Sequence, residues 1–600
     1  MLDVRVYRAA FLPALIALFV AAFSLADRPA PVSSPLAADA FSAERAFGGK
    51  TPLHNSLLEL ARSFPNRAPG SADDAALADR VAAALAERDR TGRPAFRVSR
   101  QRDGAIETVV GVRPGLSSRQ IVVLSHRDAA SRPGLADLSG TAVMLELARL
   151  FRARELRKTL VLVSTSGATD GFTGARAWAD RASGAPVDGV LVLGDLAGEP
   201  THRPWVVPWS LGSDAAPLGL QRTVEAAVRS QAGVPGGTRA IAQWIRRALP
   251  FTVSEQGVVA DASLPAVLVG ATGERGPSPS EPVLRARLGR FGRAVLRAVS
   301  AVDAAGPRLD DAASAEPFGD GPSGIVTLRN VLPDWAVRLV VGTLLLPALL
   351  TALDGFFRVR RRRLAVRPWL IWLGATGLPV VLAWLWIRAL GLTGALDGPD
   401  APVLPLPPFE RAGAIALGST VVVLAFGWFG VRALLLTRAR DRGSPLAGSL
   451  AASAGTLLCT LAALVWLFNP YAAALLLPAA HLWLFAAAPG TRLRGWAGAA
   501  AIVAGLVPFV IVALYYSLAL ALDPLALGWM ALLSTASGQL SLATAIVAGA
   551  VLACLAGLLA VVRTRRRVEA RREPEPIVTR GPASYAGPGS LGGTESALRR

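Results

Sequence analysis

The sequence predicts an α/β domain joined to a polytopic α-helical membrane domain. The chain of 600 residues is 52% hydrophobic, with a mean hydropathy of +0.43, which is more apolar than a soluble globular protein. Apolar stretches of roughly 20 residues, the length that crosses a bilayer, occur at the start of the chain and repeatedly after residue 334. Between them, short apolar runs alternate with helical patterns, as expected for an α/β layer fold.

Eight apolar stretches predict eight membrane-spanning helices. The first lies within residues 1–26 and is either a signal peptide or a retained anchor, so the residues that follow it are expected to be exported. The other seven form a predicted membrane domain over residues 335–563. They cover residues 335–356, 368–390, 412–436, 449–468, 471–488, 497–522 and 541–562.

Arginine clusters predict the orientation of these helices. Runs of arginine follow the second, fourth, sixth and eighth stretches, whereas residues 391–411 carry three acidic residues and a single arginine, and residues 523–540 carry no arginine. The positive-inside rule then places both termini in the cytoplasm and residues 27–334 outside, in a multi-pass protein of the cell membrane. The tail over residues 564–600 is rich in Pro, Gly and charge, and we expect it to be disordered.

Composition excludes two classes of site. The formal charge of +20 comes almost entirely from arginine, and many of these arginines lie in loops between apolar stretches, so we expect contact with membrane lipids and no nucleic acid. Cys459 and Cys554 both lie inside apolar runs, which excludes a disulfide framework or a thiolate metal knuckle. Any metal must therefore be held by carboxylates and by some of the four histidines.

Residues 27–304 are predicted to form the exported domain, and its helices and strands are expected as follows. Ser71 and the acidic residues after it begin a helix over residues 71–89. Residues 96–101 and 107–114 form an antiparallel pair, and residues 120–125, 159–165, 189–195 and 265–270 are short apolar runs typical of buried strands. Helices are predicted at residues 141–154 and 281–299. Residues 305–334 form a linker to the membrane domain.

Polar residues gather where two of these strands end. His126, Asp128 and Asp137 follow the strand over residues 120–125, and Asp195 ends the strand over residues 189–195. Open α/β sheets place their ligand sites at the carboxyl ends of the strands, so His126, Asp137 and Asp195 could hold a cation such as zinc. The spacing also allows a structural interpretation, in which Asp137 only caps its helix and His126 is a strand-end residue with an ordinary partner.

Four successive segments resemble landmarks of the di-zinc aminopeptidases of the aminopeptidase Y type, a group within metallopeptidase family twenty-eight. The resemblance covers roughly residues 60–300. It implies a mixed sheet with helices on both faces. The segments are NRAPGSADDAALADRVAAAL, IVVLSHRDAASRPGLADLSGTAVMLELARL, TLVLVSTSGATDGFTGARAWAD and VLVLGDLAGE.

The resemblance implies a role for each matching residue. His126 and Asp195 would bind the first zinc, and Asp137 would bridge two zinc ions. Asp128 would contact the ligand His126 without binding zinc itself. The family's Glu-Glu pair, which supplies the general base and a ligand of the second zinc, should stand just before GFTG, where the sequence has Ala168 and Thr169. Asp170 is the one neighbouring carboxylate that a shifted loop could bring into that place.

The family's final histidine is missing as well. Residues 275–283 contain no histidine, and His202 comes too early in the chain. The resemblance therefore implies at most one zinc ion and a degenerate member of the family, because neither alanine nor threonine can take a proton from a metal-bound water.

These observations favour a binding or scaffold role outside the membrane. The expected partner is a peptide, a protein or a lipid-linked ligand in the exported cleft, in a protein that could be part of a membrane complex. One alternative is an active membrane-bound aminopeptidase with a displaced base. A second is transport through the helical bundle, for which His481, near the middle of its predicted span, is the candidate residue. His481 could equally form a structural hydrogen bond within the bundle.

Overall fold

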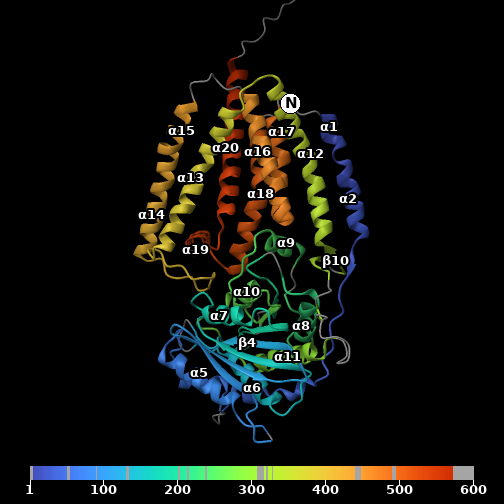
Figure 1. Cartoon of the computed structure of the whole chain (residues 1–600), viewed down its shortest axis with the longest axis vertical. Helices are drawn as coiled ribbons and strands as arrows, with labels where there is room; N and C mark the ends of the chain where they lie inside the picture. Colours follow the sequence, from blue (N-terminus) through green and yellow to red (C-terminus); the bar gives the residue numbers. More distant parts are fainter. Residues whose placement is uncertain are drawn as a thin grey trace, which may run out of the picture.

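The structure, a computed structural model, consists of an α/β domain packed against one end of a bundle of long helices (Figure 1). It describes residues 4–49, 54–89, 91–129, 134–199, 203–212, 215–236, 239–306, 317–318, 322–327, 329–439, 447–488 and 495–571.

A seven-stranded mixed sheet forms the centre of the α/β domain, and the sequence predicts six of its strands but misses the short edge strand Trp205–Val207. The strand order is β2-β3-β5-β4-β6-β8-β7. Strands β5, β4, β6 and β8 are parallel, and β2, β3 and β7 pair antiparallel at the two edges. The strands cover Arg97–Asp103 (β2), Ile106–Arg113 (β3), Ser117–His126 (β4), Lys158–Thr165 (β5), Val187–Leu193 (β6), Trp205–Val207 (β7) and Ala266–Gly270 (β8).

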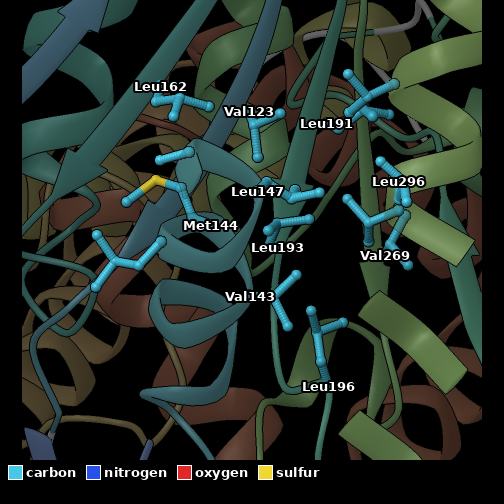
Figure 2. Close-up of a cluster of buried hydrophobic side chains, with 14 of the residues drawn as sticks. Val123, Val143, Met144, Leu147, Leu162, Leu191, Leu193, Leu196, Val269 and Leu296 are labelled. Carbon is cyan, nitrogen blue, oxygen red and sulfur yellow. The ribbon is translucent and has the colours of Figure 1, made fainter. Parts of the chain in front are cut away.

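The central strands are buried on both faces because successive side chains point to opposite sides of the sheet. On β4, Val123 belongs to one hydrophobic cluster and Leu124 to another. Figure 2 shows the first cluster, in which Val123 and Leu191 of the sheet lie near Leu147 and Leu296 of two covering helices. The near-continuous apolar runs in the sequence are therefore the expected pattern for these strands.

Helices cover both faces of this sheet. The cluster of Figure 2 contains residues of α5 (Ala72–Leu85), α6 (Ser139–Phe151), α8 (Leu218–Gln231) and α11 (Arg285–Ala304). The cluster on the other face contains residues of α7 (Thr173–Ala182) and α10 (Glu255–Asp261). The domain also contains α3 (Ala43–Phe47), α4 (Leu57–Ser63) and α9 (Ala240–Ala248), with short 3-10 turns at Ala38–Ala40 and Gly273–Arg275.

Eight helices in the described part of the chain are long and apolar enough to cross a membrane, and each overlaps one predicted span. This supports membrane association, whereas the assignment of inside and outside stays a prediction. The candidate spans are Val6–Phe23, Asp334–Arg361, Arg367–Leu392, Arg411–Leu436, Ser449–Phe468, Pro470–Ala487, Trp496–Leu520 and Leu542–Thr564.

These spans correspond to named helices in Figure 1. They are α1 (Val4–Ala9) with α2 (Leu12–Phe23), α12 (Asp334–Arg361), α13 (Arg367–Leu392), α14 (Arg411–Ala425) continuing through a π-helical turn into α15 (Arg432–Ala439), α16 (Ala447–Phe468), α17 (Pro470–Ala487), α18 (Gly495–Leu520) and α20 (Leu542–Arg571).

The structure differs from the predicted boundaries in three places. Residues 523–540, expected to be a loop, contain a short apolar helix, α19 (Pro524–Ala536), which Asp523 caps by accepting a hydrogen bond from the Ala526 amide. The second half of the predicted linker forms strands β9 (Gly324–Val326) and β10 (Asn330–Pro333), and β10 pairs antiparallel with both β9 and β1 (Ala26–Asp27). Helix α20 continues to Arg571, because the residues after 563 include no Gly or Pro before 574. Residues 572–600 of the predicted tail lie outside the described residues.

Candidate functional site

One cavity at the carboxyl end of the sheet collects most of the predicted site residues. His126 is the last residue of β4, and Asp195 follows the neighbouring parallel strand β6. The two residues are adjacent because parallel strands end at the same edge of the sheet. The cavity has a volume of about 400 Å³, and its wall includes His126, Asp128, Asp137, Ala168, Thr169 and Asp195.

The cavity also contains Glu255, a carboxylate that sequence reasoning missed. Glu255 is the first residue of α10 and is buried. Its Oε2 lies 3.2 Å from Nδ1 of His126, and its Oε1 accepts a hydrogen bond of 2.7 Å from the hydroxyl of Thr165. The only signal in the sequence is an acidic residue some ten positions before the strand over residues 265–270, which is too common a pattern to single out.

The ion pair with Glu255 determines the charge on His126. Burial by itself lowers the pKa of His126, but the hydrogen bond and negative charge of Glu255, together with the charges of Asp128 and Asp137, raise it to about 9. His126 is therefore protonated at neutral pH and cannot offer a neutral ring nitrogen to a metal unless Glu255 moves away.

Three other acidic groups in the cavity have raised pKa values. Burial raises the pKa of Asp128 to about 7, although the charges of His126 and Arg127 oppose the shift. Burial likewise raises the pKa of Asp195 to about 6, against hydrogen bonds from the amides of Ala197 and Gly198. The pKa of Asp137 is raised for the same reason. These shifts mark a cavity in which burial makes the charged form of each carboxyl group costly.

The contacts of the cavity carboxylates bear on whether they could hold zinc. Among the described residues, both oxygens of Asp128 and Oδ2 of Asp195 are buried without a hydrogen-bond partner. Unpaired oxygens of this kind suit a positively charged group. However, no set of three or more His, Cys, Asp and Glu side chains within the described ranges is close enough to hold a metal ion. As arranged, His126, Asp137 and Asp195 do not form a zinc site, and the expectation of one zinc stays a prediction.

The structural interpretation of the same residues can also be checked. Helix α6 begins at Ser139 and its N-cap residue is Leu138, so Asp137 is not the capping residue. Asp137 instead faces the cavity from the turn before the helix. His126 is partnered, but by the buried carboxylate of Glu255 from another element.

A buried ionic network fixes the backbone behind the cavity. The guanidinium of Arg127 is fully buried, with Nε 2.8 Å from Oδ1 of Asp74 and Nη1 donating to the carbonyl of Ser164 at 3.1 Å. The other oxygen of Asp74 accepts a hydrogen bond of 2.7 Å from the hydroxyl of Ser166. Arg67, also buried, donates from Nε to the carbonyl of Arg127 at 3.0 Å. This network ties the end of β4 to the end of β5 and holds His126 and Asp128 in place.

The loop after β5 places Ala168 and Thr169 in the cavity wall and leaves Asp170 outside it. Asp170 is exposed, and its amide donates to the carbonyl of Gly167 at 3.0 Å. Phe172 follows with a left-handed backbone (φ 58°) and a buried ring in the cavity wall. The carboxylate that contacts His126 is Glu255, so the structure does not support Asp170 in the role of a displaced base.

His481, the candidate residue for transport, has a partner on each ring nitrogen. His481 on α17 lies 2.9 Å from the carbonyl of Leu344 through Nε2 and 2.8 Å from the hydroxyl of Tyr7 through Nδ1, and its ring stacks on Phe11. These contacts account for both ring nitrogens as links between α17, α12 and α1. His202 lies outside the described residues.

Residues 108–232 match the profile of Peptidase family M28. This M28 segment contains His126, Asp128, Asp137 and Asp195 but ends before Glu255. A comparison with the sequences of curated proteins found no match.

Solved structures of two peptidases and of a glutaminyl cyclase are similar to part of the chain. LapA aminopeptidase of Legionella pneumophila is 15% identical, with a TM-score of 0.34, and the match covers 41% of this chain and 69% of LapA. A Zn-dependent exopeptidase from Parabacteroides distasonis is 16% identical, with a TM-score of 0.33 and coverage of 43% and 98%. A glutaminyl cyclase from an Acidobacteriales bacterium is 14% identical, with a TM-score of 0.33 and coverage of 46% and 96%.

Proposed function

We propose that the M28-like domain of this membrane-associated protein binds the free amino end of a peptide without cleaving it. The observation that carries the proposal is which side chains line the cavity and how they are paired. Ala168 and Thr169 stand where the resemblance expects a pair of glutamates, and His126 is held as a cation by Glu255. The cavity thus keeps its acidic binding groups while the groups expected to activate water are replaced.

An ammonium group matches the unpaired atoms of the cavity. The oxygens of Asp128 and Oδ2 of Asp195 accept hydrogen bonds and are buried without a donor. An ammonium carries one positive charge and three donors and has no acceptor. Binding such a group would lower the pKa values of the cavity carboxylates, since a nearby positive charge favours their ionised form.

The residues that line the cavity where the general base is expected do not favour hydrolysis. A general base contributes about 10²- to 10⁴-fold to a reaction rate, and the side chains of Ala168 and Thr169 cannot supply it. Glu255 is tied to both His126 and Thr165, so it is not free to accept a proton from water while those bonds persist.

Calorimetry on the full-length protein in detergent tests this proposal. We expect Leu-Gly-Gly amide to bind and its N-acetylated form to bind at least tenfold more weakly. Asp195→Asn should weaken binding of the free amine, whereas Asp103→Asn, at an exposed residue of β2, should leave it unchanged. Release of leucine from the peptide, with or without added zinc, would contradict a purely binding role.

Glu255 also supports a second candidate, a membrane-bound aminopeptidase with a displaced base. It is a buried carboxylate that reaches His126 from a separate helix, and it would become available if a metal replaced it on His126. This candidate predicts zinc-dependent release of leucine that chelators abolish and that Glu255→Gln reduces by about 10²-fold or more. If zinc-loaded protein releases no leucine, the binding role stands.

A further inference from the structure

The cavity is not built by the α/β domain alone. Its wall also includes Leu404 and Leu406, from the segment between α13 and α14, and Leu520 and Leu522, at the end of α18. We call these four leucines the apolar roof. The acidic groups of the cavity and the apolar roof come from parts of the chain more than 100 residues apart, and in Figure 1 the α/β domain meets the helical bundle at this level.

The apolar roof is packed in place by both parts of the protein. Its members belong to one hydrophobic cluster with Val253, which comes just before Glu255, and with Ile245 of α9. Val253 and Leu520 are both almost fully buried. The roof therefore continues directly into the packed interface between the α/β domain and the bundle, and it is not a loosely attached loop.

A buried ion pair joins the end of α18 to the rim of the cavity. Arg246 of α9 pairs with Glu274 at 2.7 Å, with side chains only 5% and 6% exposed, and Glu274 lies in the cavity wall. The Nε of Arg246 donates to the hydroxyl of Tyr515 at 3.0 Å, and its guanidinium lies 5.2 Å from the ring centroid of Tyr516. Both tyrosines are on α18. This contact holds α18 at a fixed position against the site.

The segment that carries Leu404 and Leu406 is held from both sides. Ala401 and Val403 are buried in the cluster that covers one face of the sheet. On the other side, Gln539 donates to the carbonyl of Pro399 at 3.2 Å, and Trp529 donates from its indole to the carbonyl of Pro407 at 3.0 Å. The roof is thus fixed between the sheet and the helices of the bundle.

We infer that the apolar roof selects the ligand, so that the peptide bound by its amino end must carry large apolar side chains at its first residues. The inference rests on the proposed function. A cavity of about 400 Å³ is at the small end of the range for small-molecule sites, roughly 300 to 1,000 Å³, so it accepts a chain end and not a folded partner. The ammonium group of the peptide would lie at the carboxylates of the cavity, which have the opposite charge. The apolar side chains of the peptide would then contact the four leucines of the roof.

The position of the roof bears on the class of ligand. Helix α18 is a candidate membrane span that ends at Leu520, so the roof lies at the end of that span. The chemical class of ligand is therefore the amino-terminal segment of a hydrophobic polypeptide, and the bundle contributes part of the recognition surface.

The inference can be tested by comparing Leu-Leu-Gly amide with triglycine amide on the full-length protein by calorimetry. Burial of a leucine side chain favours binding by about 10- to 100-fold, so we expect the leucine peptide to bind at least tenfold more tightly. Leu404→Ser and Leu522→Ser should each weaken binding of the leucine peptide by a larger factor than they weaken binding of triglycine amide, so that the preference falls. Leu404→Met, which nearly conserves the volume, should retain the preference and shows that the position tolerates change.

Leu525→Ser is the matched control, because Leu525 on α19 is 86% exposed and is not part of the cavity wall. Equal binding of the two peptides by the wild-type protein would overturn the role of the roof and leave the proposed function intact. Equal loss in Leu525→Ser and Leu404→Ser would also overturn it. Failure of the wild-type protein to bind either peptide would overturn the proposed function and this inference together.

Discussion

Replacing Glu255 with glutamine should change the charge of His126 at neutral pH. The glutamine keeps the shape of the side chain but removes the negative charge 3.2 Å from Nδ1 of His126. Glu255 is the main partner that offsets burial, and burial is the largest single effect and lowers the pKa. We therefore expect the pKa of His126 to fall from about 9 toward its ordinary value of 6.5, with the charges of Asp128 and Asp137 still raising it. A fall over this whole interval corresponds to roughly 3 kcal/mol of coupling between the two groups.

The same ion pair makes stability depend on pH. Because the pKa of His126 is higher in the folded chain than the unfolded value of 6.5, its stabilising contribution is fully present below pH 6.5 and is lost as pH rises through about 9. The wild-type protein should lose at most about 3 kcal/mol of unfolding free energy over this range, and Glu255→Gln should lose little. Asp195 titrates near pH 6 and Asp128 near pH 7, so Asp128 overlaps the lower part of this range, and the difference between the wild-type protein and Glu255→Gln as pH rises toward 9 reports His126.

Histidine-selective NMR can measure this pKa directly, since the chain has only four histidines. The signal of His126 is assigned by its absence from His126→Gln. Glu44→Gln, at an exposed residue of α3, controls for the loss of one surface charge. The reasoning is refuted if His126 titrates near 6.5 in the wild-type protein, or if Glu255→Gln leaves its pKa unchanged.

Two further predictions concern the packing behind and beside the cavity. Arg127→Met removes the ion-pair partner of the buried Asp74 and should lower the free energy of unfolding, measured with denaturant, by about 3–5 kcal/mol. Adding Asp74→Leu in the same chain should recover part of this loss. An unchanged free energy of unfolding in Arg127→Met would refute the role of the network. Gly171→Ala would place a Cβ 2.7 Å from the amide nitrogen of Asp400, whereas Gly184→Ala has a similar positive φ in open space. We expect Gly171→Ala to lower the unfolding free energy by about 1–3 kcal/mol more than Gly184→Ala, and equal effects would argue against tight docking of this segment.

Much of the fold could be predicted because its elements follow from local pattern. The runs over residues 120–125 and 159–165 are strands because a strand buried on both faces needs apolar residues at every position. The candidate spans were equally predictable, since hydrocarbon thickness sets their length. Helix α19 could not be predicted as a span because its 13 residues are too few to cross a bilayer. Its segment also contains no arginine, which is the composition expected of a loop outside the membrane.

The site was predicted only in part. His126, Asp137 and Asp195 follow strand ends, and a general rule about sheets brings strand ends together. Glu255 lies 129 residues from its partner and has no motif that marks it. Asp170, next to the expected glutamate positions, was the natural candidate by sequence, but the turn after Gly167 leaves it exposed.

The amino-acid sequence by itself determined that the chain has an α/β domain and a set of long apolar helices. It also determined that carboxylates gather at one end of the sheet and that positions 168 and 169 hold no glutamate. Each of these depends on residue type or on short-range periodicity, which act through local backbone preference and burial. Only the tertiary structure decided that Glu255 forms an ion pair with protonated His126 and that leucines of the helical bundle line the cavity. Those contacts join segments far apart in the chain, and their energies arise only when the packed sheet and helices bring the segments within contact distance.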